Sequence, residues 1–547
     1  MTSTWSETGT TTEEFADRVR SNQESLGTEI KAHYDFIVCG SGSSGSVVAR
    51  RLAENPDVSV LVLEAGGSDE APETLRPEMW LANLGSERDW NFTAEPSCHL
   101  NGRAIPYSMG KVLGGGSSIN VMVWARGHKN DWDYFAAEAK DERWSYESVL
   151  AIYRDIEDWH GTADPDHRGT GGPVYVESAS NPSPIATEGL VAADLLGIPT
   201  FDHQNGSLME SDGGASIVDL RIRNGYRQSV FRSYLFPLMD RPNVTVLSGA
   251  LVTRVRFDKA SGGWAATGVE FVHDGQLHRV SAGSEVVLSL GAIHTPKVLM
   301  QSGIGDRAEL RHHGIPVVQH LPGVGRNLQD HPAFSCVWES KTPLPWRNSG
   351  GEMTVFAKSD PSLDTPDLQA YQLEFPYSSR ENAAKIVLPE SGWAMLGAVV
   401  RPKSRGRIYL TGPDPLDTVR IHANLMSHPD DIKAAIACIE LCREIGNSAA
   451  LRPFSKREVM PGNLNHIQLE RFIRTDVTTY HHQTCTAKMG NDNMSVVDGS
   501  LKVYGVQNLR IADGSIMPRV TTGNTMAPCV IIIGERAGQI LRERHAL

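Results

Sequence analysis

The sequence predicts an α/β protein in which a domain with a parallel sheet is interleaved with a second domain built on an antiparallel sheet flanked by helices. A strand–helix–strand pattern occupies residues 34–64, and short apolar runs beside Gly-rich turns recur at 244–247, 269–271, 285–289 and 509–513. Residues 340–410 are instead dense in Pro, Ser and charged residues, with the alternating apolar positions that antiparallel strands show. The parallel-sheet domain is therefore expected to be discontinuous.

The strand–helix–strand pattern carries a nucleotide-binding fingerprint. Gly40 and Gly42 permit a tight turn and the close approach of a pyrophosphate, while Gly45 lets the following helix pack on the strand. The N-terminus of that helix supplies partial positive charge for phosphate groups. Glu64 ends the second strand at the spacing of a carboxylate that binds a ribose hydroxyl pair, and no arginine follows it directly, which disfavours a 2′-phosphate. We therefore expect a Rossmann-like fold here and an adenosine cofactor such as NAD or FAD.

The length of the chain and its lack of repeats decide the domain organisation. A chain of 547 residues exceeds one ordinary hydrophobic core, and no internal repeat or long low-complexity linker occurs in it. Interleaved domains therefore fit better than separate modules in a row. We predict a polar, partly disordered arm at 1–33, a cofactor-binding domain at 34–150, 230–332 and 487–547, and a substrate-binding domain at 151–229 and 333–486.

Composition argues against several classes of protein. Asp and Glu (65 residues) outnumber Lys and Arg (52), so the net charge of −13 disfavours nucleic acid as a partner. No apolar run approaches the ~20 residues that span a bilayer, and the polar first thirty residues lack a signal core. We therefore expect a cytoplasmic protein without a membrane span. The seven cysteines are scattered and contain no CxxC, which argues against a disulfide scaffold or a metal site.

Three further blocks are more specific than these patterns. They read GKVLGGGSSINVMVWARG at 110–127, GAIHTPKVLMQSGIG at 291–305 and PGVGRNLQDHP at 322–332. Together with the fingerprint, they resemble the glucose-methanol-choline (GMC) family of flavoprotein oxidoreductases, over a stretch from about residue 34 to residue 541. The resemblance implies a Rossmann-like FAD-binding domain with an interleaved substrate-binding domain, FAD as cofactor, and oxidation of a small-molecule alcohol to the aldehyde or ketone.

The same resemblance implies which residues hold the cofactor. The loop at 114–118 offers backbone N–H groups with little side chain in the way, which suits a diphosphate or the edge of a flavin ring. Asn120 can donate to a flavin carbonyl, and Ile119 stands where members with covalently attached FAD carry histidine, so noncovalent FAD is expected. The cofactor-binding residues that the fingerprint and the resemblance imply are Gly40, Gly42, Ser43, Ser44, Gly45, Glu64, Ala65, Gly110, Val112, Gly115, Gly116, Ser117, Asn120, Val121, Met122, Val252, Gly291, Asp513, Gly514, Asn524 and Thr525.

Two C-terminal residues acquire catalytic roles from the resemblance. Counting back from residues 486–490 aligns His482, rather than His481, with the family's catalytic base, and Asn524 with the second residue of its His-Asn or His-His pair. His482 would take the hydroxyl proton, Asn524 would steady the alkoxide, and the α-carbon would pass a hydride to flavin N5. The family commonly has an aromatic residue at the position of His481, so this histidine either packs on the flavin pocket or assists its neighbour.

The substrate is less well defined than the cofactor. Tyr371 and Phe375 are candidate substrate-binding residues together with His481, His482 and Asn524, because aromatic and amide side chains suit a neutral alcohol. Choline-oxidising members carry a glutamate where this chain has Ala333, so choline is disfavoured. Glu374 is expected to be a solvated strand residue rather than a partner for a cationic substrate.

The electron acceptor and two other classes of function stay open. Oxygen, reduced to hydrogen peroxide, is the first choice of acceptor, and a quinone or similar acceptor is the alternative, because the bulk of Tyr480 near the flavin weakens the case for an oxidase. A flavin-containing lyase or a photodecarboxylase on the same scaffold is a further alternative. A noncatalytic nucleotide-binding module is disfavoured by the flavin-specific blocks. The oligomeric state is left open.

Overall fold

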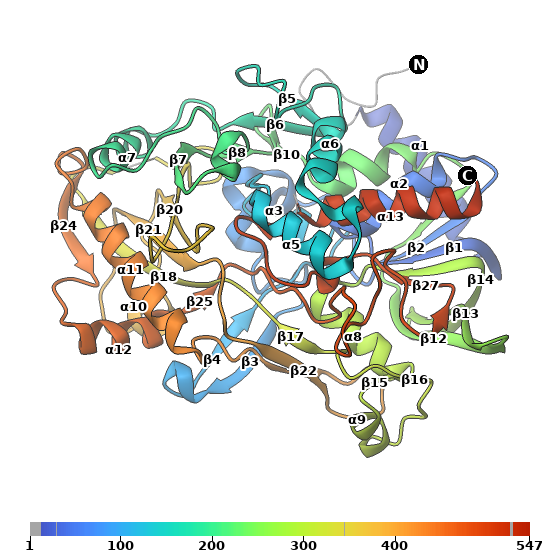
Figure 1. The fold of residues 1–547 in the computed structure, drawn as a ribbon. Helices are drawn as coiled ribbons and strands as arrows, with labels where there is room; N and C mark the ends of the chain where they lie inside the picture. The colour runs from blue at the N-terminus through green and yellow to red at the C-terminus, as the bar shows by residue number, and fades with distance from the viewer. Residues whose placement is uncertain (1–11, 29, 344, 526–528) are drawn as a thin grey trace.

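Two β-sheets organise the protein, and they lie on opposite sides of the molecule in Figure 1. The structure is a computed structural model that describes residues 12–28, 30–343, 345–525 and 529–547. The predicted α/β class is confirmed. The helices of the protein include α3 (Pro72–Leu75), η1 (Pro77–Asn83), α4 (Gly116–Ile119), α5 (Lys129–Ala139), α6 (Tyr146–Ile156), α7 (Pro184–Leu195), α9 (Arg307–His312), α10 (Arg380–Ala383) and α12 (His466–Asp476).

The first sheet has the strand order β11-β2-β1-β14-β13-β12. Its parallel strands are β1 (His33–Cys39), β2 (Val60–Leu63), β11 (Val244–Leu247), β14 (Gln276–Leu288) and β27 (Leu509–Ile511), and β12 (Leu251–Ala260) and β13 (Gly263–His273) complete it as antiparallel neighbours, with β26 (Val506–Gln507) beside β13. β2 and β14 flank β1 on opposite sides, so the strand order reverses its direction at β1. In an open parallel sheet, a crevice forms at the carboxyl end of the strand where this happens.

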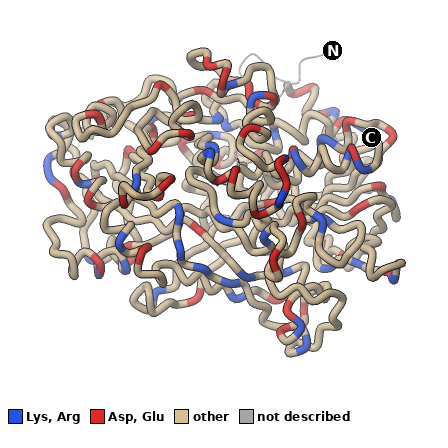
Figure 2. The backbone as a smooth tube through the Cα atoms, in the orientation of Figure 1, with Lys and Arg blue, Asp and Glu red and all other residues tan. Residues whose placement is uncertain are grey.

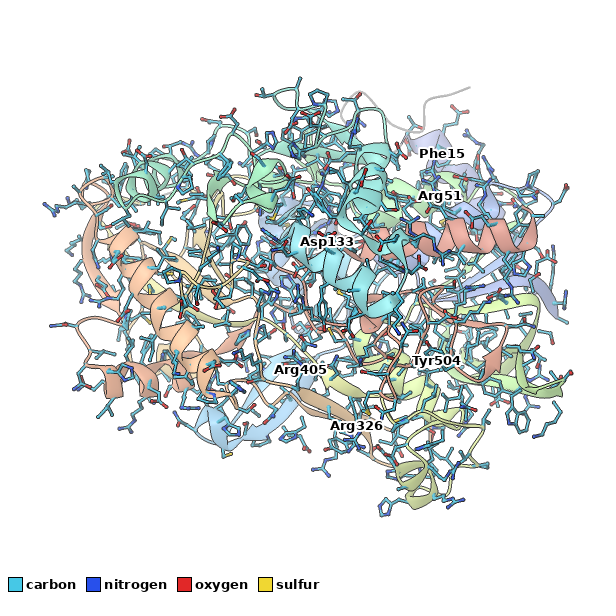
Figure 3. All side chains as sticks on the ribbon, viewed as in Figure 1. Phe15, Arg51, Asp133, Arg326, Arg405 and Tyr504 are labelled. Carbon is cyan, nitrogen blue, oxygen red and sulfur yellow. The ribbon has the colours of Figure 1, made fainter. Side chains whose placement is uncertain are left out.

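Two helices that are distant in sequence lie side by side next to the first sheet (Figure 1). Helix α2 (Ser43–Ala53) follows β1 directly, and α13 (Val530–His545) ends the chain. Gly534 lets them approach closely, since a Cβ there would lie 2.8 Å from the Val47 side chain. Arg51 on α2 also pairs with Glu535 on α13 at 2.7 Å (Figure 3). The C-terminal helix is therefore part of the nucleotide-binding fold.

The second sheet is antiparallel throughout, as predicted from residues 340–410. Its order is β24-β18-β21-β20-β19-β7 with β25 beside β18, and its strands are β7 (Gly214–Ile217), β18 (Pro332–Ser340), β19 (Met353–Ala357), β20 (Leu368–Leu373), β21 (Gly392–Val399), β24 (Ser455–Met460) and β25 (Thr478–Thr479). Helix α11 (Pro429–Gly446) packs on it through a buried face that includes Cys438 and Cys442. The predicted domain boundaries, which divide residues 34–547 into three cofactor-binding and two substrate-binding segments, stay a prediction.

Smaller strands fill the space around the two main sheets. They are β3 (Phe92–Ser97), β4 (Arg103–Tyr107), β5 (Glu157–Trp159), β6 (Val174–Ser178), β8 (Asp219–Leu220), β9 (Ile222–Arg223), β10 (Tyr226–Arg227), β15 (Ile304–Gly305), β16 (Gln319–His320), β17 (Arg326–Leu328), β22 (Gly406–Leu410) and β23 (Val419–His422). Helix α8 (Gly291–Gln301) runs from the end of β14 toward the sheet of β17, β22 and β23. Figure 2 shows acidic and basic residues interspersed along the whole backbone. No helix in the described part of the chain combines the length and apolar character needed to cross a bilayer.

Residues 13–28 of the predicted N-terminal arm form a helix that packs on the first sheet, which the expectation of a partly disordered arm did not include. Helix α1 (Glu13–Thr28) buries Phe15 and Val19, which stand one turn apart and form a short apolar stripe in an otherwise polar stretch (Figure 3). Gln23 donates to the carbonyls of Met239 and Val244 and accepts from the Val246 N–H at 2.8 Å. The helix thereby covers the edge strand β11, whose backbone groups would otherwise be unpaired. Residues 1–11 lie outside the described residues.

Candidate active site

A cavity of about 240 Å³ opens between the two sheets at the carboxyl end of β1. Its walls come from both sheets and from the loops that follow β1, β2 and β14. The sequence-predicted residues that line it are Gly40, Gly42, Ser43, Ser44, Glu64, Ala65, Gly110, Gly115, Gly116, Asn120, Val121, Val252, Gly291, Tyr371, Phe375, His481, His482, Asp513, Gly514 and Asn524. One cavity thus unites both ends of the chain with the middle of the second sheet.

The glycine turn after β1 needs its glycines for three different reasons. Gly40 has a φ of 99°, and a Cβ there would lie 2.3 Å from the Ser289 carbonyl oxygen. At Gly45 a Cβ would lie 1.9 Å from the Gly40 carbonyl oxygen, so this glycine serves the contact between helix and strand. A Cβ on Gly42 would meet no protein atom within 4 Å, so it would project into the space where a ligand could lie. Helix α2 has no side-chain N-cap. The N-terminus of α2, with its partial positive charge, therefore lies at the cavity wall, where it suits an anionic group.

Glu64 is held rigidly in the cavity wall. Its Oε2 accepts from the N–H of Ser41 at 3.0 Å and from the Ser41 hydroxyl at 2.8 Å, while its Oε1 accepts from the N–H of Gly66 at 2.9 Å. Burial raises the pKa of this carboxyl, and these hydrogen bonds work in the opposite direction. A carboxylate fixed in this way presents its remaining lone pairs to a ligand in one orientation.

The loop from Gly110 to Asn120 forms another wall. A Cβ on Gly110 would lie 2.3 Å from the Gly115 carbonyl carbon, so the loop folds back on itself only with glycine there. The Oδ1 atom of Asn120 accepts from the Met122 N–H and from Arg227, both at 3.0 Å. Its Nδ2 donor has no partner among the described residues, so it is available to a ligand.

Five predicted cofactor residues do not line the cavity, and their positions give the reasons. Gly45 faces the β1 turn, and Ser117 is used within the protein, donating to the Gly114 carbonyl and accepting from the Val230 N–H. Val112 and Met122 are buried in the core, and Met122 adopts a φ of 61° that turns the chain after the loop. Thr525 is buried with no hydrogen-bond partner for its hydroxyl among the described residues. The contact of these five residues with a cofactor stays a prediction, and Thr525 adjoins residues 526–528, which lie outside the described residues.

His482 is positioned by the motif at 329–331, which runs beside it. The Asp330 Oδ1 atom accepts from the N–H of His331 at 2.7 Å and from the N–H of His482 at 2.9 Å. The hydroxyl of Thr479 donates to the other carboxyl oxygen. The Nδ1 atoms of His331 and His482 are 2.9 Å apart. Burial lowers the pKa of His482 well below its ordinary value, so the ring is neutral near pH 7.

The second nitrogen of His482 is free. Nε2 has no hydrogen-bond partner among the described residues. The atom is not fully buried, although the residue as a whole is only 5% exposed. Since His482 lines the cavity, Nε2 is the atom that a ligand can reach. A neutral imidazole with an accessible nitrogen beside an apolar cavity can act as a general base.

His481 and Asn524 also present unpaired polar atoms. His481 has a φ of 59°, and neither its Nδ1 nor the Oδ1 of Asn524 has a partner in the described part of the protein, although both are buried. The segment that carries Asn524 is tied down by Asp131, which accepts from the Thr522 N–H at 2.6 Å and pairs with Arg519 at 3.2 Å. Buried polar atoms without partners are costly, so these atoms indicate a site that a ligand completes.

Several residues of the cavity wall were not predicted. The rings of Trp90 and His294 are in tilted contact with their centroids 4.0 Å apart, and burial lowers the pKa of His294 to about 3. The only sequence signal for His294 was its place in the block 291–305, one turn into α8. Other unpredicted lining residues are Trp80, Leu81, Leu84, Ser108, Met109, Val123, Ala250, Leu251, Ser289, Leu290, Ala292, Gln369, Leu373, Tyr377, Leu396, Thr479 and Val530. Most have apolar or aromatic side chains, and the sequence does not show which of them face the cavity. Ile119 and Tyr480, both expected near the flavin, also line it.

Glu374 was expected to be a solvated strand residue, but it is buried. Only 3% of it is exposed, its Oε2 accepts from the Arg347 N–H, and its Oε1 is unpaired. The reason is that Glu374 directly follows β20 and the loop at 347–350 packs against it, since the Glu374 N–H donates to the Gly350 carbonyl at 2.8 Å. Burial, with a further contribution from the nearby Glu352, raises the pKa of Glu374 to about 7.

The protein should lose stability as Glu374 ionises. Its folded-state pKa lies above the ordinary value of about 4.3, so the folded protein binds more protons than the unfolded chain between about pH 4.5 and pH 7, and stability falls as pH rises through that window. Glu374→Gln should remove this loss, which urea unfolding at pH 5 and pH 8 would measure. Exposed Glu390 supplies the control variant, Glu390→Gln. Parallel stability curves for wild type and Glu374→Gln would contradict the assignment.

The residues of the cavity fit FAD. The β1 turn and the N-terminus of α2 suit a pyrophosphate, Glu64 suits a ribose, and the loop 114–120 with its free Asn120 donor suits a flavin. The unpaired buried atoms of Ser44, His481 and Asn524 lie along the same cavity. An adenine dinucleotide that carries a polar ring system can supply partners for them.

Comparisons with known proteins agree with this geometry. Family models described as GMC oxidoreductase match residues 34–333 and 402–532. The mitochondrial choline dehydrogenase of Mus musculus is 35% identical over 94% of this chain and 91% of its own length, and an alcohol dehydrogenase [acceptor] of Pseudomonas putida is 34% identical over 93% and 95%. Among solved structures, pyridoxine 4-oxidase from Mesorbium loti superposes with a TM-score of 0.88 at 30% identity, covering 94% of this chain and 99% of that one.

Proposed function

Because the chain belongs to the GMC oxidoreductase family, we propose that it uses noncovalently bound FAD to oxidise an alcohol to the aldehyde or ketone. The observation that carries the proposal is the free Nε2 atom of the neutral His482, which opens into a cavity that also holds the dinucleotide fingerprint. A base in that position can act on a substrate that shares the cavity with the cofactor. Ile119, at the position where family members with covalent FAD carry histidine, supports noncovalent binding.

The protein's own residues divide the work of alcohol oxidation. His482 removes the hydroxyl proton at Nε2, and the Asn524 amide donates to the oxygen as negative charge develops on it. Tyr371 and Phe375 form an apolar wall that excludes water from the reacting centre. When bound, FAD supplies the hydride acceptor at flavin N5. Removing the proton first makes the α-carbon a better hydride donor, so the base has a direct effect on rate.

Oxygen is the acceptor that we favour, with hydrogen peroxide as the product. The alternative is a dehydrogenase that passes electrons to a quinone or another acceptor. The relatives and structural neighbours include both oxidases and acceptor-dependent dehydrogenases. The large side chain of Tyr480 is fixed in the cavity wall, because its hydroxyl donates to the Leu396 carbonyl at 2.5 Å. Peroxide yield per alcohol oxidised in air, compared with turnover on an artificial quinone without oxygen, distinguishes the two.

Anaerobic bleaching of the flavin tests the proposal. Purified protein loaded with FAD is mixed in the dark with a panel of aromatic, aliphatic and sugar alcohols, and the flavin absorbance is followed. We expect at least one class of alcohol to reduce the flavin. A lyase or a photodecarboxylase does not need this reaction, so a flavin that no alcohol in the panel reduces would favour those functions. A protein that binds no FAD on reconstitution would contradict the proposal altogether.

Choline should be a poor substrate, despite the names of several relatives. Ala333 is fully buried against Ala398 and Val400, with Leu396 and Tyr480 packed on the cluster, so no carboxylate stands at this position. Loss of one hydrogen bond or contact to a charged group costs about 1.5–3 kcal/mol, so kcat/KM for choline should be roughly 10- to 100-fold below that for the best neutral alcohol. Steady-state assays of choline and its neutral isostere 3,3-dimethylbutanol measure this ratio. Equal or greater kcat/KM for choline would show that another group binds the cation.

A further inference from the structure

We infer that His331 is a positioning residue that holds His482 in the tautomer whose Nε2 atom is free to accept a proton. The inference rests on the proposed function in one respect, the role of His482 as base. It is carried by the direct contact between the two rings, whose Nδ1 atoms are 2.9 Å apart and whose planes are 87° apart.

Two arrangements of protons satisfy this contact, and only one of them leaves a usable base. Two neutral imidazoles can share the hydrogen bond only if one Nδ1 carries the proton and the other does not. If His482 donates, its Nε2 has a free lone pair facing the cavity. If His331 donates, neutral His482 carries its proton on Nε2 and cannot accept the substrate proton there. The proton position on His331 therefore decides whether His482 is active.

The surroundings of His331 favour the active arrangement. The other nitrogen of this ring, Nε2, is buried without a hydrogen-bond partner among the described residues, and the polar groups that act on the ring are the backbone carbonyls of Thr521 and Val400. A bare lone pair on that nitrogen would face carbonyl oxygens, whereas an N–H there is attracted to them. Since Nδ1 of His331 faces the His482 ring, we infer that these carbonyls act from the Nε2 side and that the proton of His331 is on Nε2, which leaves its Nδ1 as an acceptor for the Nδ1–H of His482.

His331 is itself neutral near pH 7. It is fully buried, and burial lowers its pKa to about 3, while the more distant Asp131 acts in the opposite direction. The other titratable groups around the pair are Asp330, which is hydrogen-bonded to both backbones, and His481 beside His482. A neutral acceptor can stabilise the imidazolium form of His482 without competing for the proton, as the carboxylate does in a hydrolase triad.

The backbone makes the contact between the rings hard to avoid. Asp330 accepts from the N–H groups of both His331 and His482, and the Tyr480 N–H donates to the His331 carbonyl at 3.1 Å. Two segments that are 151 residues apart in sequence are thereby fixed in register beside each other. The ring contact is then set by side-chain rotamers alone, so a substitution at His331 can change the hydrogen bond without moving the backbone of His482.

Two substitutions separate the hydrogen bond from the packing. His331→Asn places an amide oxygen close to the position of Nδ1 and keeps an acceptor, while His331→Phe fills the space without one. The first readout is the ¹⁵N shifts of the His482 ring in FAD-loaded protein labelled with ¹⁵N-histidine, assigned by comparison with His482→Gln. We expect a protonated Nδ1 and an unprotonated Nε2 in wild type and His331→Asn, and a mixture of tautomers in His331→Phe. A protonated Nε2 in neutral wild-type His482 would overturn the inference, whether or not the variants fold.

The second readout is the rate constant of anaerobic flavin reduction as a function of pH. We expect His331→Phe to lower the limiting rate constant by roughly 100-fold, at the low end of what a general base contributes, and to shift its apparent pKa, with little change in substrate affinity. His331→Asn should recover most of the rate and the wild-type pH profile. Equal losses in both variants with an unchanged profile would mean a packing role only. If no alcohol reduces wild-type flavin, the proposed function fails, while the tautomer measurement still tests the role of His331.

Discussion

Replacing His482 with glutamine will slow anaerobic flavin reduction by roughly 10²- to 10⁴-fold, the range that a general base contributes, and will leave FAD bound. The side chain is neutral, its Nε2 atom is free in the cavity, and its backbone is held by Asp330 independently of the imidazole. Glutamine keeps the volume and polarity of the site but cannot accept a proton near neutral pH. Stopped-flow reduction at saturating alcohol isolates this step from reoxidation and product release.

His481 provides the matched control. It is the adjacent residue, it lines the same cavity, and it is also largely buried, so His481→Phe changes the wall without removing the proposed base. We expect this variant to retain flavin reduction within about tenfold of wild type, a loss below the general-base range. If His481→Phe loses as much as His482→Gln, the base is the pair and not His482 alone. An unchanged rate in His482→Gln would end the proposal that this residue takes the proton.

The nucleotide-binding end of the site could be predicted from sequence because each residue there answers a local requirement. Gly40 must adopt a positive φ, Gly45 must touch a backbone oxygen, and Glu64 must follow a strand whose neighbour is adjacent in the chain. All three requirements lie within one strand–helix–strand unit. Sequence reasoning is weaker where a side chain serves the loop rather than the ligand, as Ser117 does through its bonds to Gly114 and Val230. A glycine-rich block alone does not show which of its hydroxyls turn inward.

The rest of the site depends on contacts between distant segments. His331 lies in a block that the resemblance singled out, yet nothing in the sequence places its ring 2.9 Å from a residue 151 positions later. Trp90 and His294 likewise meet only because the loop before β3 folds over α8. Glu374 shows the same limit for burial, since an alternating pattern predicts a solvated position, while the loop at 347–350 packs against this residue just after β20. Which face of a strand is covered is a property of the tertiary structure.

Replacing Glu64 with alanine should weaken FAD binding by roughly 10- to 100-fold and also lower the stability of the apoprotein. The substitution removes a ligand for the ribose and leaves the N–H groups of Ser41 and Gly66 without their acceptor. Loss of hydrogen bonds to a charged carboxylate costs about 1.5–3 kcal/mol, which sets the change in Kd, while each buried donor left without a partner costs about 1–3 kcal/mol of stability. Glutamine will not rescue the site, because its NH₂ group would face the N–H and O–H donors of Ser41.

Fluorescence titration of the apoprotein with FAD, together with its thermal unfolding, measures where this energy is lost. Part of the penalty falls on the apoprotein itself, since the Ser41 and Gly66 donors are buried by the protein fold and not only by the ligand. Glu70→Ala is the control, because that side chain is 46% exposed and does not line the cavity. If Glu64→Ala loses stability but binds FAD with wild-type affinity, Glu64 organises the β1 turn and does not contact the ribose. If both quantities fall, the carboxylate does both, and the turn and the ribose site are parts of one hydrogen-bonded unit.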